Sequence, residues 1–368
     1  MYHTFESKLE LSASTFFVIK NTLAELSKKN RTRFYEDKNN NETNKVYYFE
    51  LLKYRGIHIT AASFIVNGFI RFFLILRINP KRILNNNDFI SVTHESETEI
   101  LYIEVNKCLS SIGIHERFEN FLIERIDYCV NPRFPDENIS AYYMELLKRG
   151  VLLYGFEPLL RYDDTQHRMI ENENAIYARN QSIIINFYNK YPEMLARPGK
   201  YQGYLEEYRG VIRFEIQCLK PKVRSMKYYN ELPDMRAFRW MKEEFSEGAL
   251  LFYVKKIFCK GDFVTLSEAR QRIMSENFRD NTKQMMLTLL ELTNEKRSLR
   301  KALDTLYNEG IQHDYLNRIL DKFDRIHVTP VTIPINWRIP RFDSPLKIVL
   351  HEIERNTPLG IGEPHFGA

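Results

Sequence analysis

The stretch 175–220 sets the expected architecture of this chain. It reads AIYARNQSIIINFYNK (175–190), then a polar connection, then VIRFEIQCLK (211–220). The two quoted segments are rich in β-branched and aromatic residues, and we expect each of them to form a β-strand. The side chains of chemical interest in these strands are Tyr188, Lys190, Arg213, Glu215 and Gln217. A phenol, a cation and a carboxylate at strand ends can make and break a phosphodiester, but they also occur in an ordinary half-exposed sheet.

Strands and helices are expected to alternate before this stretch. The hydrophobic periodicity predicts strands at 4–12, 45–63 (with a break near Gly56), 68–78 and 121–131, and helices at 13–28, 99–112 and 139–149. Pro80 and Pro132 follow two of the strands, where a residue without an N–H cannot continue a ladder. We therefore expect an α+β fold, with a mostly antiparallel sheet that carries its helices on one face.

The chain after residue 250 changes to helical spacing. Helices are predicted at 265–276, 280–293, 296–308 and 312–323. Thr265 followed by Glu268 fits a capping box, and the short break at 277–280 suits either a helix-turn-helix or a generic helical hairpin. The prolines that follow predict extended chain. The expected domains are 1–250, a helical domain at 251–330 and an extended tail at 331–368.

Composition limits the classes of protein. The 368 residues are 44% hydrophobic, enough for a sizeable core, and the net charge of +5 permits a local basic groove. The 22 tyrosines and 25 phenylalanines suit either a β-rich core or stacking on nucleic-acid bases. Four cysteines without metal-site spacing fit a reducing compartment. We see no signal peptide or membrane-spanning run, so we expect a cytoplasmic protein with no membrane partner.

A tyrosine is suited to DNA strand transfer. Its phosphodiester link to DNA keeps the bond energy, so the strand can be rejoined later. Tyr188 lies two residues before Lys190, so in a continuous strand both would point to one face, while Phe187 would point to the core. No phosphate-binding loop, dinucleotide fingerprint or common hydrolase motif is found in the sequence.

Two acidic residues, Asp127 and Glu215, stand inside otherwise apolar strands. Carboxylates are rarely buried unless they are paired or bound to a metal ion. The alternative to a metal site is an ion pair within each strand, since Arg125 shares a face with Asp127, and Arg213 shares one with Glu215. A basic cluster follows the second quoted strand and is either a contact for DNA phosphates or a solvated face. It consists of Lys220, Lys222, Arg224 and Lys227.

Four blocks in order carry a resemblance to a known family. They are LILRINPKRIL (74–84), ERIDYCVNP (124–132), AIYARNQSIIINFYNKYPEM (175–194) and VIRFEIQCLKPK (211–222). Together they resemble the replication-initiation-factor family of rolling-circle plasmid Rep proteins, and are similar to the filamentous-phage gene II/X type of replication protein. The resemblance covers roughly residues 45–225.

This resemblance implies a Rep nuclease-like sheet and a specific activity. It implies a bacterial initiator that nicks one origin strand, keeps the 5′ phosphate on a tyrosine and religates. Tyr188 would be the nucleophile with Lys190 assisting, and Tyr177 the second choice. Asp127 and Glu215 would hold Mg²⁺ or Mn²⁺. The DNA contacts would be Arg179, Arg213, Lys220, Lys222, Arg224 and Lys227. The implied partners are single-stranded or hairpin origin DNA, a host helicase and a second copy of the chain.

Three positions depart from the family pattern. Arg77 precedes Ile78-Asn-Pro where the family often has a metal-competent residue, and Asn131 stands where it often has a second aspartate. Ala178 replaces the glycine usual after the first tyrosine. These departures favour a non-enzymatic DNA-binding regulator as the alternative. A third interpretation is an interaction protein of a mobile element.

Overall fold

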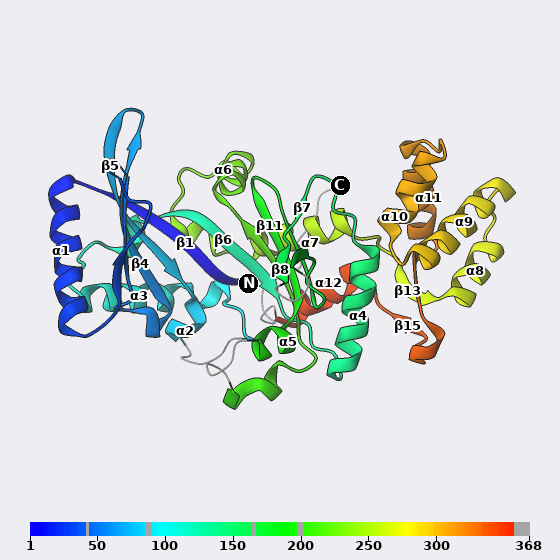
Figure 1. Ribbon diagram of the computed structural model, residues 1–368, viewed down its shortest axis with the longest axis horizontal. Coiled ribbons are helices and arrows are strands. Elements are labelled where there is room, and N and C mark those ends of the chain that lie inside the picture. The colour runs from blue at the N-terminus through cyan, green and yellow to red at the C-terminus, as the bar shows by residue number, and fades with distance from the viewer. Residues whose placement is uncertain (42–43, 85–89, 164–166, 197–201, 357–368) are drawn as a thin grey trace. The chain divides into compact units, whose positions relative to one another are not determined.

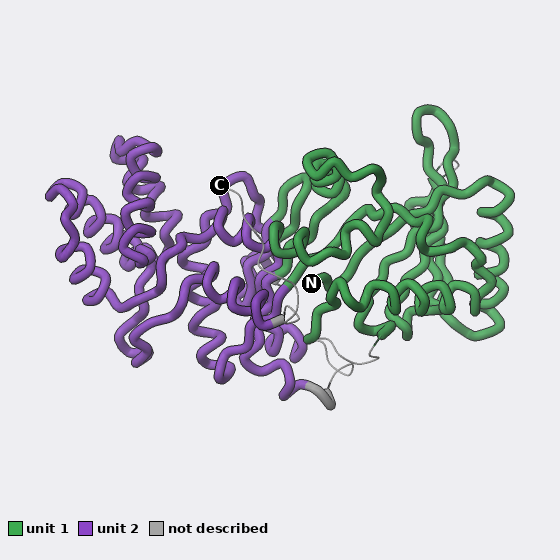
Figure 2. The backbone as a smooth tube through the Cα atoms, turned by 180° about the vertical axis from the view of Figure 1, so that it is seen from behind, with its two compact units in different colours: residues 1–129, 179–185, 215–249 green, residues 130–178, 186–214, 250–368 purple. Residues whose placement is uncertain are grey.

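The computed structural model describes residues 1–41, 44–84, 90–163, 167–196 and 202–356. The chain divides into two compact units, shown in Figure 2. The first comprises residues 1–129, 179–185 and 215–249, and the second comprises 130–178, 186–214 and 250–368. Each unit is built from several separate stretches of chain, so neither corresponds to one continuous segment.

The first unit contains a large antiparallel sheet (Figure 1). Its strands are β1 (Tyr2–Leu11), β2 (Phe34–Glu36), β3 (Lys45–Phe49), β4 (Ile57–Val66), β5 (Phe69–Ile78) and β6 (Leu122–Val130), with residues 215–218 of β12 (Ile212–Cys218) and 183–185 of β11 (Ile183–Asn189). Their order is β2-β3-β4-β5-β1-β6-β12-β11. The predicted strand 45–63 does break near Gly56, and its two parts pair as β3 and β4.

One face of this sheet is buried beneath helices. The helices of this unit are α1 (Ala13–Lys29), α2 (Pro80–Leu84), α3 (Thr98–Ser111), α6 (Lys220–Tyr229) and the start of α7 (Glu243–Ile257). On β5, Leu74 and Leu76 are fully buried, and the ring of Phe72 lies 4.9 Å from that of Phe16 on α1. Phe5 on β1 packs 5.9 Å from Phe118, which contacts α3. The α+β class with a large antiparallel sheet is therefore confirmed, and α1 and α3 cover its apolar face.

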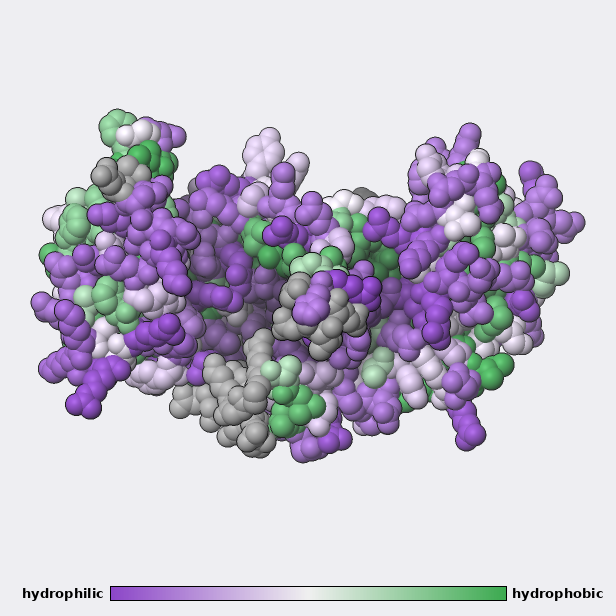
Figure 3. Space-filling view, in the orientation of Figure 1, coloured by the Kyte–Doolittle hydropathy of each residue, from purple (hydrophilic) through white to green (hydrophobic). Residues whose placement is uncertain are grey.

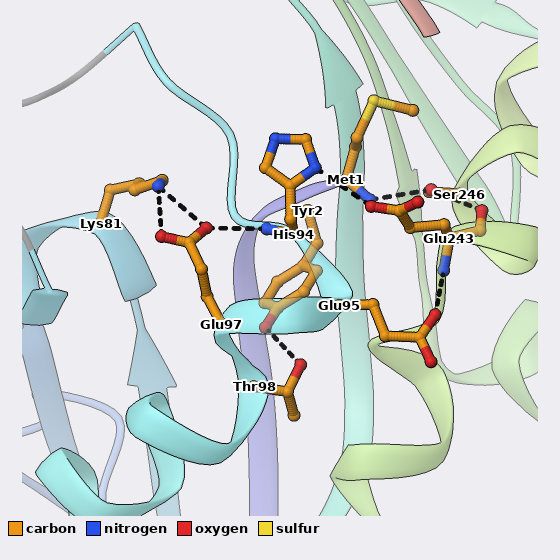
Figure 4. A network of polar contacts seen from close by, with 9 residues as sticks. All are labelled: Met1, Tyr2, Lys81, His94, Glu95, Glu97, Thr98, Glu243 and Ser246. Atoms are coloured by element: carbon orange, nitrogen blue, oxygen red, sulfur yellow. Dashed lines mark hydrogen bonds and ion pairs between the residues drawn. The ribbon is translucent and has the colours of Figure 1, made fainter. Parts of the chain in front are cut away.

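Polar contacts secure the start of β1 (Figure 4). The network contains Met1, Tyr2, Lys81, His94, Glu95, Glu97, Thr98, Glu243 and Ser246. The Met1 ammonium donates to Ser246 Oγ at 2.9 Å, and the Tyr2 hydroxyl lies 3.2 Å from that of Thr98. Lys81 donates to Glu97 at 2.7 Å. The central strand β1 is thus connected to α2, α3 and α7 through side chains distant in sequence.

The second unit contains further sheet strands and the C-terminal helices, and the single strand expected at 175–190 is in fact two strands, 175–179 and 183–189. Its main strands are residues 212–214 of β12, residues 186–189 of β11, β10 (Ala175–Arg179) and β7 (Glu157–Pro158). They lie in the order β12-β11-β10-β7. Two further strands, β8 (Arg161–Asp163) and β9 (Arg168–Ile170), pair with each other. Its helices are α4 (Glu137–Gly150), α5 (Lys190–Leu195), most of α7, α8 (Leu266–Ser275), α9 (Asp280–Lys296), α10 (Leu299–Asn308), α11 (His313–Arg325) and α12 (Pro345–Asn356). The four helices expected between 265 and 323 are confirmed as α8 to α11, and Thr265 caps α8.

The extended tail predicted at 331–368 is corrected for residues 345–356, which form α12. A separate three-stranded sheet is formed by strands that precede α12 in the chain. In it, β13 (Asp262–Thr265) lies between β14 (Val328–Ile333) and β15 (Arg341–Phe342). Buried Asp262 accepts hydrogen bonds from the Ser344 N–H at 3.0 Å and from Lys347 Nζ at 2.8 Å. This distant carboxylate fixes the first turn of α12, and no local periodicity reveals it. The rest of the tail, 357–368, lies outside the described residues.

The surface is mainly hydrophilic on the face shown in Figure 3. Hydrophobic side chains gather at the tip of the β4–β5 hairpin, where they are Ile65, Val66, Phe69 and Ile70. Within the described residues, no helix combines the length and apolar character needed to cross a membrane.

Gly261, next to β13, is predicted to be essential for packing. A Cβ there would lie 2.2 Å from the backbone carbon of Val328, closer than packed atoms approach. Because backbone cannot swing aside like a flexible side chain, Gly261→Ala should cost about 1–3 kcal/mol. We expect a lower melting temperature when thermal unfolding is followed by circular dichroism.

Gly248 provides the control for this experiment. It lies in α7, and a Cβ there would meet nothing within 4 Å. Gly248→Ala should be neutral or stabilise by about 0.5–1 kcal/mol, because alanine loses less conformational freedom in a helix. Equal destabilisation by both substitutions would contradict the steric explanation.

Candidate active site

Two tyrosines lie together on neighbouring strands of the second unit. Tyr177 on β10 and Tyr188 on β11 have ring centroids 6.1 Å apart, and both side chains are partly exposed. The residues next to them point inward: Ala178 is fully buried, and the Phe187 ring lies 4.8 Å from that of Phe214. The predicted core position of Phe187 is confirmed, and the strand alternation brings the two phenols to one face.

The end of β11 is held by Asn189, directly after Tyr188. Its side-chain amide donates to Glu137 at 2.6 Å and to Ser140 at 3.0 Å, both on α4. Its side-chain oxygen accepts from the N–H of Tyr191 and caps α5. Asn189 is 1% exposed, so these bonds form in a protected setting, where they are worth more than at the surface. They fix where the tyrosine strand ends.

Lys190 does not share a strand face with Tyr188, which corrects that expectation. The strand ends at Asn189, and Lys190 is the first residue of α5. Pro192 lies in the first turn of this helix, where a missing N–H costs no hydrogen bond. Lys190 is 3% exposed, and its ammonium lies 5.5 Å from the ring centroid of Tyr208. Its charge is therefore buried against an aromatic face.

A cavity of about 800 Å³ adjoins Tyr177 within the second unit. α4 and the start of α10 form much of its wall. Its charged lining carries both signs: Lys148, Arg297, Arg300 and Lys301, with Glu145, Glu171, Glu173 and Asp304. Lys148 Nζ donates to the backbone oxygen of Asn172 at 2.7 Å, and burial lowers the pKa of Lys148. The volume is sufficient for a nucleotide-sized group.

Arg213 lies within the core of the second unit. It is 1% exposed, and its Nε donates to Asn131 Oδ1 at 2.8 Å. Asn131 therefore binds an arginine side chain. A direct contact between Arg213 and DNA would require that side chain to become exposed.

Asp127, on β6 of the first unit, forms an ion pair with its strand neighbour Arg125. The Arg125 guanidinium donates to both carboxylate oxygens, at 2.8 and 2.7 Å. Asp127 is 1% exposed, and this burial raises the pKa of Asp127 to about 6, with Arg125 opposing the shift. The in-strand ion pair considered from the sequence is therefore present. Asp127 is mainly ionised at neutral pH.

Glu215, on the part of β12 in the first unit, lies on the charged face near Asp127. It accepts a hydrogen bond from Gln217 at 2.9 Å, and His3 Nδ1 lies 3.7 Å from its carboxylate. The negative charge of Glu215 raises the pKa of Asp127, whereas the positive charge of Arg77 lowers it. These groups define a charged face on the side of the sheet that α1 and α3 do not cover. Within the described residues, no three His, Cys, Asp or Glu side chains are grouped to hold a metal ion.

The basic cluster lies on α6. This helix begins at Lys220 with Pro221 in its first turn, and Val223 and Met226 are its buried residues. Lys220 pairs with Glu124 at 2.7 Å, while Arg224 is exposed and Lys222 and Lys227 are partly exposed. Arg179 is exposed at the end of β10. The sequence located these cations, but it did not identify their helix.

Two contributors to the tyrosine site were missed from the sequence. Asn189 followed by Pro192 is a recognisable helix start, because asparagine is a favoured cap and proline fits a first turn. Tyr208 gives no comparable signal, since it is eighteen residues from Lys190 and lies in the 3₁₀ segment Gln202–Tyr208.

Among solved structures, this chain shows a distant likeness to a replication protein. A solved rolling circle replication initiator protein from Geobacillus stearothermophilus matches with a TM-score of 0.29 and 12% identity, over 63% of this chain and 79% of that one. A likeness at this level decides neither fold nor function. No protein-family model matches the chain, and no curated protein does.

The Arg125–Asp127 pair predicts pH-dependent stability. Arg125→Met would leave a buried carboxylate without its partner, which should cost about 3 kcal/mol at pH 8. The folded-state pKa of Asp127 would rise further above the unfolded value of about 3.9. At pH 5 Asp127 is largely protonated with or without Arg125, because its pKa in the intact pair is already about 6, so most of the charge part of this cost disappears. The variant should be less destabilised at pH 5 than at pH 8 in urea unfolding.

A double variant separates this charge effect from lost packing. Asp127→Asn removes the titrating carboxyl, so adding Arg125→Met to that variant should cost the same at pH 5 and at pH 8. A penalty for Arg125→Met that is the same at pH 5 and pH 8 would show that the buried charge does not cause it.

Proposed function

We propose that the chain is a rolling-circle replication initiator that nicks and rejoins one DNA strand through a tyrosine. The observation that carries this proposal is the pair Tyr177 and Tyr188, with ring centroids 6.1 Å apart on neighbouring strands. The four ordered sequence blocks that resemble replication initiation factors give further support. The protein would act in the bacterial cytoplasm.

Tyr188 is the proposed nucleophile, and Tyr177 is the second choice. The phenolic oxygen of Tyr188 would attack the scissile phosphorus as the bond to the 3′ oxygen breaks. The departing 3′ oxygen takes a proton, and the 5′ phosphate stays on the tyrosine. Attack by the freed 3′ hydroxyl reverses the step and rejoins the strand. Lys190, beside Tyr188 in the chain, would contribute positive potential at the end of β11.

Asp127 and Glu215 are the residues proposed to hold Mg²⁺ or Mn²⁺. Carboxylate oxygens are the ligands these ions take, and Mg²⁺ often binds through one or two carboxylates with water and substrate phosphate completing its shell. When bound, such an ion neutralises charge that develops on the scissile phosphate. Arg125 already donates to both oxygens of Asp127, so metal binding would compete with that ion pair.

DNA would be held mainly through its phosphates. Lys222, Arg224 and Lys227 on α6, together with Arg179, are proposed as backbone contacts, and Lys220 would contribute from its pair with Glu124. Affinity from such contacts falls as salt rises, because each contact releases counterions. Single-stranded or hairpin origin DNA is the proposed substrate, and a host helicase and a second copy of the chain are the proposed protein partners.

A non-enzymatic DNA-binding regulator is the second candidate. The observation that favours it is that an arginine binds each of the two positions where the resembled family often has an aspartate. Asp127 is paired with Arg125, and Asn131, in place of an aspartate, binds Arg213. A protein with this arrangement could keep DNA affinity without holding a metal ion.

A covalent-adduct assay tests the enzyme. The full chain is incubated with Mn²⁺ and 3′-labelled single-stranded fragments from the DNA that flanks its gene. We expect a labelled protein–DNA adduct on a denaturing gel, because the 5′ phosphate of the labelled fragment would be bound to tyrosine. Tyr188→Phe should abolish the adduct, while Tyr54→Phe, an exposed tyrosine of the first unit, should leave it unchanged.

Other outcomes of this assay lead to different conclusions. An adduct that survives Tyr188→Phe but is lost in Tyr177→Phe would move the nucleophile to Tyr177. Salt-sensitive DNA binding without any adduct would support the regulator. Absence of DNA binding would reject both candidates.

A further inference from the structure

The C-terminal end of α6 exposes two adjacent tyrosines. Tyr228 is 79% exposed and Tyr229 is 78% exposed, and their ring centroids lie 5.5 Å apart at an interplanar angle of 80°. Neither tyrosine takes part in the proposed nicking reaction. Large aromatic side chains that are exposed together lose the stabilisation of burial, so a pair this open is a candidate for contact with a ligand.

The helix that carries these tyrosines is anchored. Val223 is fully buried and Met226 is 9% exposed, so one side of α6 packs into the first unit. Asn230 ends the helix, with its side-chain amide donating to the Met226 oxygen at 2.8 Å. The tyrosines therefore extend from a fixed base. A tyrosine ring has only two rotatable side-chain bonds, so ordering it on a ligand costs little entropy.

The charged residues of α6 itself have one sign. The ten residues of α6 include four cations and no acidic residue: Lys220, Lys222, Arg224 and Lys227. Lys227 directly precedes the tyrosine pair. Within the part of the chain that the structure describes, Arg224 and Lys227 form no ion pair. The surface beside the rings is thus suited to a polyanion.

We propose that Tyr228 and Tyr229 stack on unpaired bases of single-stranded DNA while the cations of α6 bind its phosphates. This deepens the proposed function and rests on it, because it assigns the form of DNA that α6 would recognise. Aromatic rings beside a positive surface bind single strands of any sequence, since every base has a π-face. Bases in a duplex are already stacked on their neighbours and do not offer that face.

A second copy of this chain is the main alternative occupant of the tyrosine pair. Tyrosine is common in protein interfaces, but lysine is depleted there. Two copies meeting through α6 would bring eight cations together without acidic residues from that helix. Phosphate is the complementary partner for this charge, and the structure therefore favours nucleic acid.

The test compares single-stranded and duplex DNA by fluorescence anisotropy, using the full chain, labelled oligothymidine and a matched duplex. Replacing both tyrosines, Tyr228→Ala with Tyr229→Ala, should weaken single-strand binding about tenfold or more at fixed salt. Duplex affinity should change less than twofold. Tyr228→Phe with Tyr229→Phe should retain single-strand binding, because the ring, not the hydroxyl, makes the contact.

Two control variants separate stacking from charge. Tyr54, 69% exposed in the same unit and outside α6, should tolerate alanine without loss of affinity. Lys227→Ala should reduce the slope of log K against log salt by about 0.7, the change expected for one lost single-strand phosphate contact. The tyrosine double variant should leave that slope unchanged.

Three results would overturn the proposal. They are unchanged single-strand affinity in the double alanine variant, an equal loss for duplex, and a changed oligomeric state in light scattering without a change in DNA binding. The covalent-adduct assay reports separately on nicking. Loss of single-strand affinity in the double variant, with no adduct from the full chain, would reject the nickase and keep the stacking surface. A normal adduct, with unchanged affinity in the double variant, would reject the stacking surface alone.

Discussion

The first unit depends on the apolar face of its sheet, which α1 and α3 cover. Alternate residues of β4 and β5, such as Ile59 and Leu76, bury against α1 and α3, and the antiparallel register places them opposite each other. The residues between them must then point to the other face. A slip of one residue would exchange the two sets, so the apolar packing also fixes where the charges lie. Glu6 and Arg77 are opposite each other for this reason.

The same alternation produces the tyrosine pair in the second unit. Burial of Ala178 and Phe187 requires Tyr177 and Tyr188 to leave the core on neighbouring strands. Alternation alone does not end the strand at the right residue. That depends on Asn189, whose side chain binds α4 and caps α5. The placement of the two phenols therefore depends on a local sequence pattern and on buried hydrogen bonds between residues about fifty positions apart.

The sequence predicted what local periodicity controls. The helices α1 and α8 to α11 and the long strands β1 and β5 follow from the spacing of apolar residues, and their observed bounds agree to within a few residues. The contacts that were not predicted join distant segments. Asp262 fixes α12, and Asn131 binds Arg213, but neither pair has a spacing from which contact could be read.

The prediction for Asp127 was open between an ion pair and a metal site, and the structure makes the two compete through Arg125. Both oxygens of Asp127 accept from its guanidinium, so a cation bound there would share the carboxylate with a like charge or displace it. A guanidinium binds phosphate with the same two-pronged geometry that it uses for carboxylate. A DNA phosphate that took over Arg125 would raise the pKa of buried Asp127, unless a divalent ion replaced the guanidinium as its positive partner. The ion pair is then compatible with an enzyme whose metal binds together with DNA, and with a regulator in which Arg125 keeps Asp127 occupied. Which of these applies depends on whether phosphate or carboxylate holds Arg125 when DNA is bound.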